Sequence, residues 1–284
     1  MDAVTLLTSL ARLPYPDIDP VFFEIGPLAL RWYGLMYLLG LAGAYWLIKS
    51  RAATKHMVLP PQQLSDLIVY AAFGVFLGGR LGYVLFYNLP FYLDNPLKIF
   101  AVWEGGMSFH GGLLGTCIAL WIFCKKRNYS VGAIADLAAG AAPIGLGFGR
   151  MGNFINGELV GRPTDVNWCM VFPQGGPECR HPSQLYEAGL EGVALFAILT
   201  ILNRRPTPPG TMFWTFIAGY GVARFIVEFY RQPDSHLGFI FQWVTMGQLL
   251  CIPMIAVGVF MIIRGYRRSY PPGIPPKPSK DCSG

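Results

Sequence analysis

Residues 138–152 read AAGAAPIGLGFGRMG, and their last six letters, Gly147–Gly152, fit the dinucleotide-binding pattern G-x-G-x-x-G. That pattern binds a nucleotide only where it follows a strand and opens a helix. Here it ends a run of apolar and small residues, which predicts the outer end of a membrane helix. We interpret the glycines as sites of close helix packing or of backbone clearance for a ligand. Arg150 then becomes the informative residue.

The composition supports a membrane protein. The chain has 284 residues, of which 53% are hydrophobic and 13% charged, whereas soluble domains contain about 25% charged residues. The basic residues form short clusters between apolar runs, as in the cytoplasmic loops of membrane proteins. A nucleic-acid-binding protein would instead carry them along one solvated face, so we expect no nucleic-acid partner.

Seven apolar segments are long enough to span a bilayer. We predict an all-α polytopic membrane protein in which these segments form one catalytic domain, residues 29–268. Clusters of lysine and arginine follow the first, third, fifth and seventh segments, which predicts a cytoplasmic C-terminus and an N-terminus outside the cytoplasm. The expected spans are 29–49, 66–88, 107–124, 131–150, 184–202, 211–230 and 243–263.

Three further parts of the chain complete the expected organisation. We expect residues 1–28 to be a periplasmic segment along the membrane surface, residues 151–182 to be a small ordered periplasmic head between spans four and five, and residues 269–284 to be a disordered cytoplasmic tail. Cys169 and Cys179 fall in the head, where a disulfide and two free or buried thiols are both compatible with the sequence. We find no cysteine and histidine set with metal-ligand spacing and predict no metal.

Polar residues gather in the outer half of the predicted spans, and an ionisable group inside a span indicates function. Arginine residues outnumber acidic residues at this depth, which predicts an anionic ligand. The nearest abundant anion is a lipid phosphate, which arginine can bind with two hydrogen bonds. The residues concerned are Tyr33, Arg80, His110, Arg150, Tyr220, Arg224 and Glu228, the last three at four-residue spacing on one helix face.

Less specific interpretations exist for several of these residues. Arg224 and Glu228 can be a purely structural ion pair, Tyr33 can belong to an aromatic belt, His110 can be a buried core histidine, and Arg150 can extend to lipid headgroups. A transporter or channel could use the same charges. The clustering on one side of the membrane and the lack of an inverted repeat argue against that alternative.

Residues 149–158, GRMGNFINGE, resemble the signature of the prolipoprotein diacylglyceryl transferase family. Further similar segments occur in the family's order from about residue 20 to residue 268. They are Arg31–Gly34, Gly79–Tyr83, Gly106–Gly112, His181–Glu187 and Arg224–Glu228.

The resemblance implies a seven-span enzyme of the bacterial inner membrane with its N-terminus in the periplasm. Such an enzyme moves the diacylglyceryl group of phosphatidylglycerol to the thiol of the lipobox cysteine in the signal peptide of a preprolipoprotein, and glycerol 1-phosphate leaves. It needs no cofactor. The implied partners are therefore phosphatidylglycerol, lipobox signal peptides and the surrounding membrane lipids.

The resemblance also implies roles for individual residues. Arg150 binds phosphatidylglycerol and His110 is important for activity. The matching residues Tyr33, Asn153, Glu158, Gly161, Tyr220, Arg224 and Glu228 lie in or near the site. On chemical grounds we expect Arg150 and Arg224 to stabilise the leaving phosphate and His110 to be the base, with Glu158 as its rival. We expect Asn153, Asn156 and Glu158 to bind the glycerol headgroup, and Arg80 to be another possible phosphate ligand.

Overall fold

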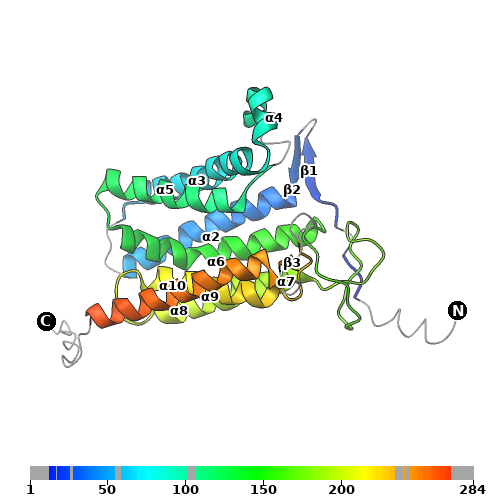
Figure 1. Ribbon diagram of the computed structural model, residues 1–284. Coiled ribbons are helices and arrows are strands. Elements are labelled where there is room, and N and C mark those ends of the chain that lie inside the picture. The colour runs from blue at the N-terminus through cyan, green and yellow to red at the C-terminus, as the bar shows by residue number, and fades with distance from the viewer. Residues whose placement is uncertain are drawn as a thin grey trace. The chain divides into compact units, whose positions relative to one another are not determined.

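The structure is a computed structural model that describes residues 13–16, 18–25, 28–54, 59–101, 106–233, 239–240 and 244–269. Residues 1–12 of the expected N-terminal segment and residues 270–284 of the expected tail lie outside these ranges. The chain forms two compact units (Figure 1). Unit 1 combines Met1–Gly43 with Ala139–Gly284, and unit 2 is Ala44–Ala138.

Helices occupy each of the seven positions at which the sequence predicts a span. Four of them are long and apolar enough to cross a membrane: α3, α6, the continuous run α7–η3–α8, and α10. Of the described helices at the other three positions, α2 and α5 do not reach the hydropathy of these four, and α9 is a shorter apolar helix of 17 residues. The helices are α2 (Trp32–Thr54), α3 (Pro61–Tyr87), α5 (Phe109–Arg127), α6 (Val131–Ile155), α7 (Ser183–Glu187), η3 (Ala188–Ala194), α8 (Leu195–Asn203), α9 (Thr211–Val227) and α10 (Met246–Ser269).

Two small hairpins correct the expectation of an all-α chain. Strands β1 (Val21–Ile25) and β2 (Leu28–Arg31) pair antiparallel, with Glu24 opposite Ala29. Their valine, isoleucine and phenylalanine residues favour an extended backbone, so the first long helix begins at Trp32 rather than at residue 29. Strands β3 (Phe239–Ile240) and β4 (Val244–Thr245) form the second hairpin.

In unit 2, α3 and α5 pack antiparallel through a seam of glycines. A Cβ atom at Gly78 would lie 2.3 Å from the carbonyl oxygen of Gly111, and one at Gly115 would lie 2.2 Å from that of Gly74. Only glycine permits so close an approach of two helix backbones. Between α3 and α5 the chain forms two short helices that were not predicted, α4 (Leu89–Asp94) and η1 (Pro96–Phe100).

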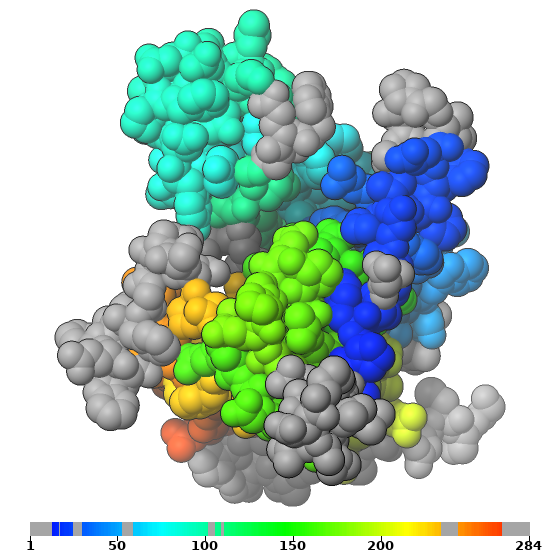
Figure 2. All heavy atoms as spheres, turned by 90° about the vertical axis from the view of Figure 1, so that its right-hand side faces the viewer, coloured from blue at the N-terminus to red at the C-terminus, as the bar shows by residue number. Residues whose placement is uncertain are grey.

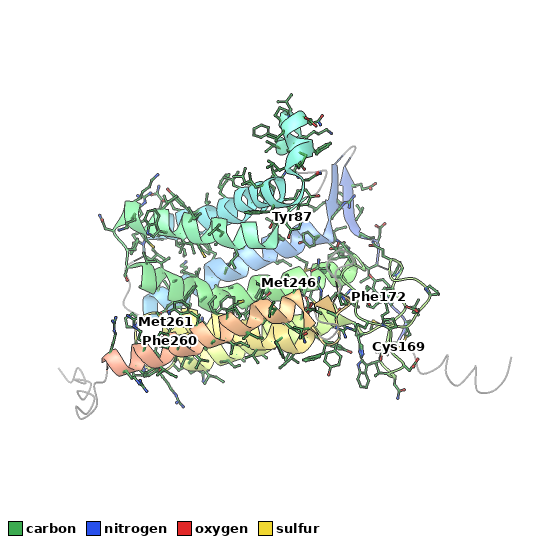
Figure 3. All side chains as sticks on the ribbon, in the orientation of Figure 1. Tyr87, Cys169, Phe172, Met246, Phe260 and Met261 are labelled. Atoms are coloured by element: carbon green, nitrogen blue, oxygen red, sulfur yellow. A yellow bond between two sulfur atoms is a disulfide. The ribbon has the colours of Figure 1, made fainter. Side chains whose placement is uncertain are left out.

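In unit 1, α9 packs antiparallel to α10. A Cβ atom at Gly258 would lie 2.8 Å from the Cβ of Ala218, so the two backbones are close here as well. Large apolar side chains also point outward: Phe260 of α10, labelled in Figure 3, is 60% exposed. An exposed apolar helix face of this kind suits contact with lipid rather than with water.

The expected head is ordered and joins the end of α6. Phe154, Met170 and Phe172 form its small core, and a disulfide joins Cys169 to Cys179, whose Cα atoms lie 5.5 Å apart. Figure 3 labels Cys169 and Phe172 in this segment. The disulfide resolves the two alternatives that the sequence left open. In Figure 2 the green atoms of the head lie against the amber atoms at the end of α9.

Candidate functional site

The run Gly147–Gly152 is helical throughout, because α6 continues to Ile155. The predicted helix end at residue 150 is therefore wrong by five residues. A Cβ atom on Gly192 would lie 2.9 Å from the Cα of Gly147, and one on Gly152 would lie 2.9 Å from the ring of Tyr33. Within the run, Gly147 and Gly152 therefore lie at close packing contacts, as expected, whereas Gly149 has open space beside it.

Arg150 and Arg224 are held by one buried carboxylate, Glu187. The Nε of Arg150 lies 2.6 Å from Glu187 Oε2, and Nη1 of Arg224 lies 3.0 Å from Glu187 Oε1. Arg231 also approaches Glu187 Oε1, at 3.4 Å. The Glu187 side chain has no solvent exposure. It therefore fixes the spacing between arginines that come from two different helices and from the segment after α9.

Two further glutamates complete this charged cluster. Glu228 Oε2 lies 2.8 Å from Nη2 of Arg224, which forms the ion pair expected from their four-residue spacing. Glu191 Oε2 lies 3.4 Å from Nη2 of Arg150, and Glu191 Oε1 accepts no hydrogen bond from the residues that the structure describes. Three arginines thus meet three glutamates, and their formal charges cancel.

The expected excess of arginine over acid is therefore wrong for this cluster. Glu187 and Glu191 supply the missing negative charge, and neither was predicted to have a role. Both lie in the fifth predicted span, four residues apart, so the rule that flagged Arg224 and Glu228 would also have found them. The π-helix η3 (Ala188–Ala194) contains Glu191. Such widened turns occur often at functional sites.

A hydrogen-bonded chain leads from Arg150 to Glu158. Arg150 Nη1 donates to Asn153 Oδ1 over 3.5 Å, and Asn153 Nδ2 donates to Glu158 Oε1 over 2.8 Å. Asn156 Nδ2 donates to the same carboxylate oxygen over 3.3 Å. Gln184, which was not among the predicted site residues, donates from Nε2 to the Glu158 backbone carbonyl over 2.7 Å. The structure thus brings together the predicted residues of the GRMGNFINGE run.

Gly161 lies where no side chain fits. A Cβ atom there would lie 2.4 Å from the carbonyl oxygen of His181 and 2.8 Å from that of Tyr230. Next to it, Arg162 donates from Nη2 to the Glu228 carbonyl over 3.0 Å and from Nε to the Arg231 carbonyl over 2.9 Å. These contacts bind the head to the end of α9, so they also fix the backbone that carries Glu228.

Three other predicted residues lie around the cluster. Tyr33 is close enough to Glu158 and Arg150 to interact electrostatically with both. Tyr220 is buried and interacts in the same way with Glu191 and with both arginines, Arg150 and Arg224. Glu228 rests on Gly247, where a Cβ atom would lie 2.9 Å from the carboxyl carbon of Glu228. Gly247 is a contributor that no sequence pattern had indicated.

Arg80 lies in unit 2 and has different partners. All of its guanidinium nitrogens donate to backbone carbonyls, namely those of Lys98, Ile99, Ala101 and Gly106. Its side chain also packs over the ring of Tyr92. Because backbone carbonyls already occupy the guanidinium, these contacts argue against the expected role of Arg80 as a phosphate ligand.

His110 also belongs to unit 2. It is the second residue of α5, and its side chain lies outside what the structure describes. The structure therefore leaves its predicted role as a base untested.

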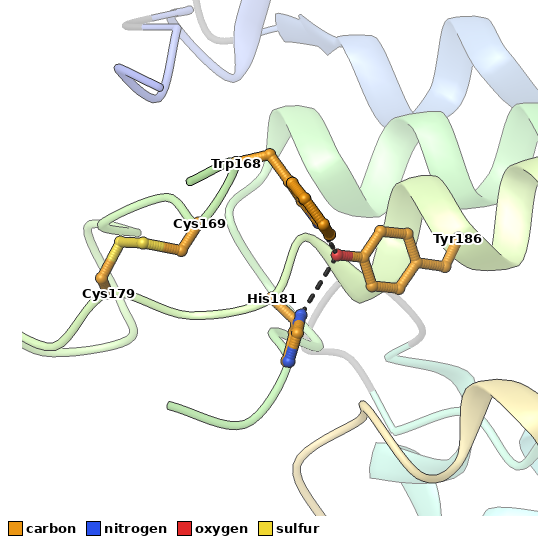
Figure 4. Close-up of a disulfide and its surroundings, with 5 residues drawn as sticks. All are labelled: Trp168, Cys169, Cys179, His181 and Tyr186. Carbon is orange, nitrogen blue, oxygen red and sulfur yellow. Dashed lines mark hydrogen bonds between the residues drawn. A yellow bond between two sulfur atoms is a disulfide. The ribbon is translucent and has the colours of Figure 1, made fainter. Parts of the chain in front are cut away.

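A polar network anchors the head to α7 (Figure 4). Trp168 donates from Nε1 to the hydroxyl of Tyr186 over 2.7 Å, and this hydroxyl lies 3.1 Å from Nδ1 of His181. Burial lowers the pKa of His181, which favours the neutral ring. Trp168 directly precedes the disulfide and Tyr186 directly precedes Glu187. The network therefore links the disulfide-bonded head to the helix that carries the central carboxylate.

Comparisons with known proteins agree with the resemblance seen in the sequence. The family model of prolipoprotein diacylglyceryl transferase matches residues 20–264. A Geobacter sulfurreducens protein, phosphatidylglycerol–prolipoprotein diacylglyceryl transferase, is 54% identical over 260 residues, which is 92% of this chain and 100% of the relative. A protein of the same name from Aliivibrio fischeri is 54% identical over 92% of this chain and 95% of the relative. Another from Pseudomonas aeruginosa is 54% identical over 90% of this chain and 97% of the relative.

Proposed function

Because the chain belongs to the prolipoprotein diacylglyceryl transferase family, we propose that it transfers the diacylglyceryl group of phosphatidylglycerol to the lipobox cysteine thiol of preprolipoproteins. Glycerol 1-phosphate leaves, and the reaction is the first step of bacterial lipoprotein maturation. The observation that carries this proposal is the arrangement of Arg150 and Arg224 on Glu187, beside the amide and carboxylate groups of Asn153 and Glu158.

The two arginines bind the phosphate of the lipid. When the thiol sulfur bonds to the glycerol carbon and the carbon–oxygen bond breaks, negative charge accumulates on the leaving phosphate, and positive groups lower the barrier. Arg150 forms a close ion pair through Nε, 2.6 Å from Glu187 Oε2. Its contacts from Nη1 and Nη2 are longer, 3.5 and 3.4 Å. The terminal nitrogens can therefore turn to a phosphate while the ion pair at Nε stays in place.

The glycerol headgroup binds beside the arginines, where hydrogen-bond acceptors gather. Asn156 and Gln184 both direct their amide nitrogens to Glu158. Their buried oxygens, Asn156 Oδ1 and Gln184 Oε1, accept no hydrogen bond from the described residues. Buried acceptors without donors are costly, and the hydroxyl groups of a glycerol headgroup supply donors. A phosphate next to a diol therefore matches arginines next to these acceptors.

The thiol of the acceptor cysteine must lose its proton before it attacks. A free cysteine has a pKa of about 8.5, so a nearby base is needed near neutral pH. His110 is our candidate for this base, since an unperturbed histidine titrates near neutrality. Glu158 is the rival candidate, because it belongs to the same hydrogen-bonded chain as Arg150.

In this proposal the enzyme is an inner-membrane protein with seven spans, a periplasmic N-terminus and a cytoplasmic C-terminus. The alternation of basic clusters along the sequence supports this orientation. The Cys169–Cys179 disulfide suits a head in an oxidising compartment such as the periplasm. The head and the charged cluster would then lie on the periplasmic side.

A transfer assay tests the proposed function. Purified protein in vesicles is incubated with headgroup-labelled phosphatidylglycerol and a lipobox peptide, and mass spectrometry measures the lipidated peptide and the released glycerol phosphate. We expect equal amounts of both products, and none with a peptide whose lipobox cysteine is replaced by serine. Flux of a polar solute without either product would instead support a transporter. Comparison of His110→Asn with Glu158→Gln, each assayed across pH, identifies the base.

A further inference from the structure

The first turn of α5 is held in place from several sides. Ser108 donates from its backbone nitrogen to the carbonyl of Gly79 over 2.8 Å. Its hydroxyl accepts from the backbone nitrogen of Gly111 over 3.2 Å, which caps the helix. Gly111 itself lies in the glycine seam with α3. Residue 110 lies between these fixed points, so its backbone position depends on how firmly they are held.

Arg80 binds both chain segments that lead into this turn. Nη2 donates to the carbonyls of Lys98 over 2.7 Å and Ala101 over 3.1 Å, and Nε donates to that of Ile99 over 2.8 Å. Nη1 donates over 3.2 Å to the carbonyl of Gly106, two residues before the cap. The side chain is only 4% exposed. A planar guanidinium can serve four carbonyls at once, whereas the single ammonium group of lysine cannot.

Gly106 is adapted to this contact. Its φ of +82° is a conformation that glycine adopts without strain, and a Cβ atom there would lie 2.8 Å from Nη1 of Arg80. Arg80 also directly follows Gly79, whose carbonyl binds Ser108. The helix α3 thus holds the start of α5 through one backbone contact and one side chain.

We propose that Arg80 is a positioning residue, which fixes the segment before α5 and through it sets the place of His110. This inference rests on the proposed role of His110 as the base. It replaces the interpretation of Arg80 as a phosphate ligand, because a phosphate could reach the guanidinium only by displacing several backbone carbonyls. The two roles predict different kinetics, since a lost lipid ligand raises KM and a misplaced base lowers kcat.

The test compares Arg80→Lys and Arg80→Gln with the wild-type enzyme. We expect kcat for transfer to fall about 100-fold in both variants, as misplaced catalytic groups typically cause, and KM for phosphatidylglycerol to stay unchanged. Lysine should not rescue kcat, because its charge is retained but its geometry is wrong. Hydrogen exchange followed by mass spectrometry should become faster in the peptide 107–115. If these variants do not fold, Gly106→Ala provides a second test, because its Cβ atom would lie 2.8 Å from Arg80 Nη1 and 2.7 Å from the Tyr83 ring and so displace the same segment. It should give a change of the same kind.

Arg162→Lys is the matched control, because Arg162 also binds backbone carbonyls but does so in unit 1. It should speed exchange in the peptide 227–233 and leave the peptide 107–115 unchanged. A raised KM with normal kcat in Arg80→Lys, or a fall in kcat without faster exchange at 107–115, would overturn the inference. Absence of any transfer by the wild-type enzyme would refute the proposed function instead, and the exchange data would still show whether Arg80 holds the turn.

Discussion

Glu187→Gln should destabilise the protein more than any other single replacement in the charged cluster. The side chain is fully buried and contacts Arg150, Arg224 and Arg231 at 2.6, 3.0 and 3.4 Å. The amide keeps the shape of the side chain but removes one negative charge, so a net positive charge is left in a buried site. Removal of one partner from a buried ion pair costs about 3–5 kcal/mol, and we expect a loss of this size.

Glu191→Gln provides the comparison within the same cluster. Glu191 is equally buried, but it contacts one arginine at 3.4 Å through one oxygen, and its other oxygen has no described partner. An amide at this position can keep the single contact geometry. We therefore expect a loss of about 1 kcal/mol, the usual worth of one hydrogen bond. Each variant removes one negative charge, but Glu187→Gln weakens contacts with three arginines and Glu191→Gln with only one.

The assay is urea-induced unfolding of both variants in the same detergent, together with the transfer assay. Glu187→Gln should also lose most of its transfer activity, because Arg150 and Arg224 are no longer held at a common spacing. If Glu187→Gln were as stable and as active as the wild-type protein, the carboxylate would not organise the arginines. An equal loss of stability in both variants would mean that charge alone, and not the shared contacts, sets the effect.

Other predictions follow from single contacts. Arg150→Lys should lower kcat/KM for phosphatidylglycerol by at least about 100-fold, because lysine cannot both hold Glu187 and bind a phosphate with two hydrogen bonds; full activity in the transfer assay would contradict this. Gly247→Ala should cost about 1–3 kcal/mol in urea-induced unfolding, since its methyl group overlaps the Glu228 carboxyl group; unchanged stability would show that Glu228 moves freely. Burial lowers the pKa of His181 in the folded protein. As the pH falls, His181 therefore takes up a proton at a higher pH in the unfolded chain than in the folded protein. The contribution of this group to stability should be complete above pH 6.5 or so and be lost as the pH falls through the lower folded pKa. His181→Gln should remove that part of the pH dependence, and an unchanged profile would refute the assignment.

Hydropathy and charge were enough to predict where the long helices lie, because each needs a long apolar run. They could not predict where the helices end. The helix α6 continues through Asn153 to Ile155 because contacts from outside the helix support its last turn. The Tyr15 hydroxyl, for example, lies 2.7 and 2.9 Å from the carbonyl oxygens of Phe154 and Ile155 and shares its one proton between them. Such support comes from residues far away in the sequence and leaves no local pattern.

The sequence predicted which polar residues lie together where they follow one another along the chain, and missed contacts between residues from different helices. The polar side chains from Arg150 to Glu158 lie together as predicted, and the structure adds that hydrogen bonds link them. Glu187 was visible in the sequence as an ionisable residue in a span, yet its contact with three arginines depends on how α6, α7 and α9 meet. The charged residues can be read from the sequence, but which of them form ion pairs with the same residue depends on how the helices pack.

Arg80 and Arg150 show this limit most directly. Both stand in the same local pattern, G-R-x-G, as Gly79–Gly82 and Gly149–Gly152. The last glycine of the first pattern packs on Gly111, and that of the second packs on Tyr33. Arg80 donates to four backbone carbonyls, and each of its three guanidinium nitrogens takes part. Arg150 instead contacts side-chain oxygens, closely at Nε and over longer distances at its terminal nitrogens. A phosphate should compete more easily for Arg150. We therefore expect the same four-residue pattern to hold the backbone in unit 2 and to bind a lipid phosphate in unit 1.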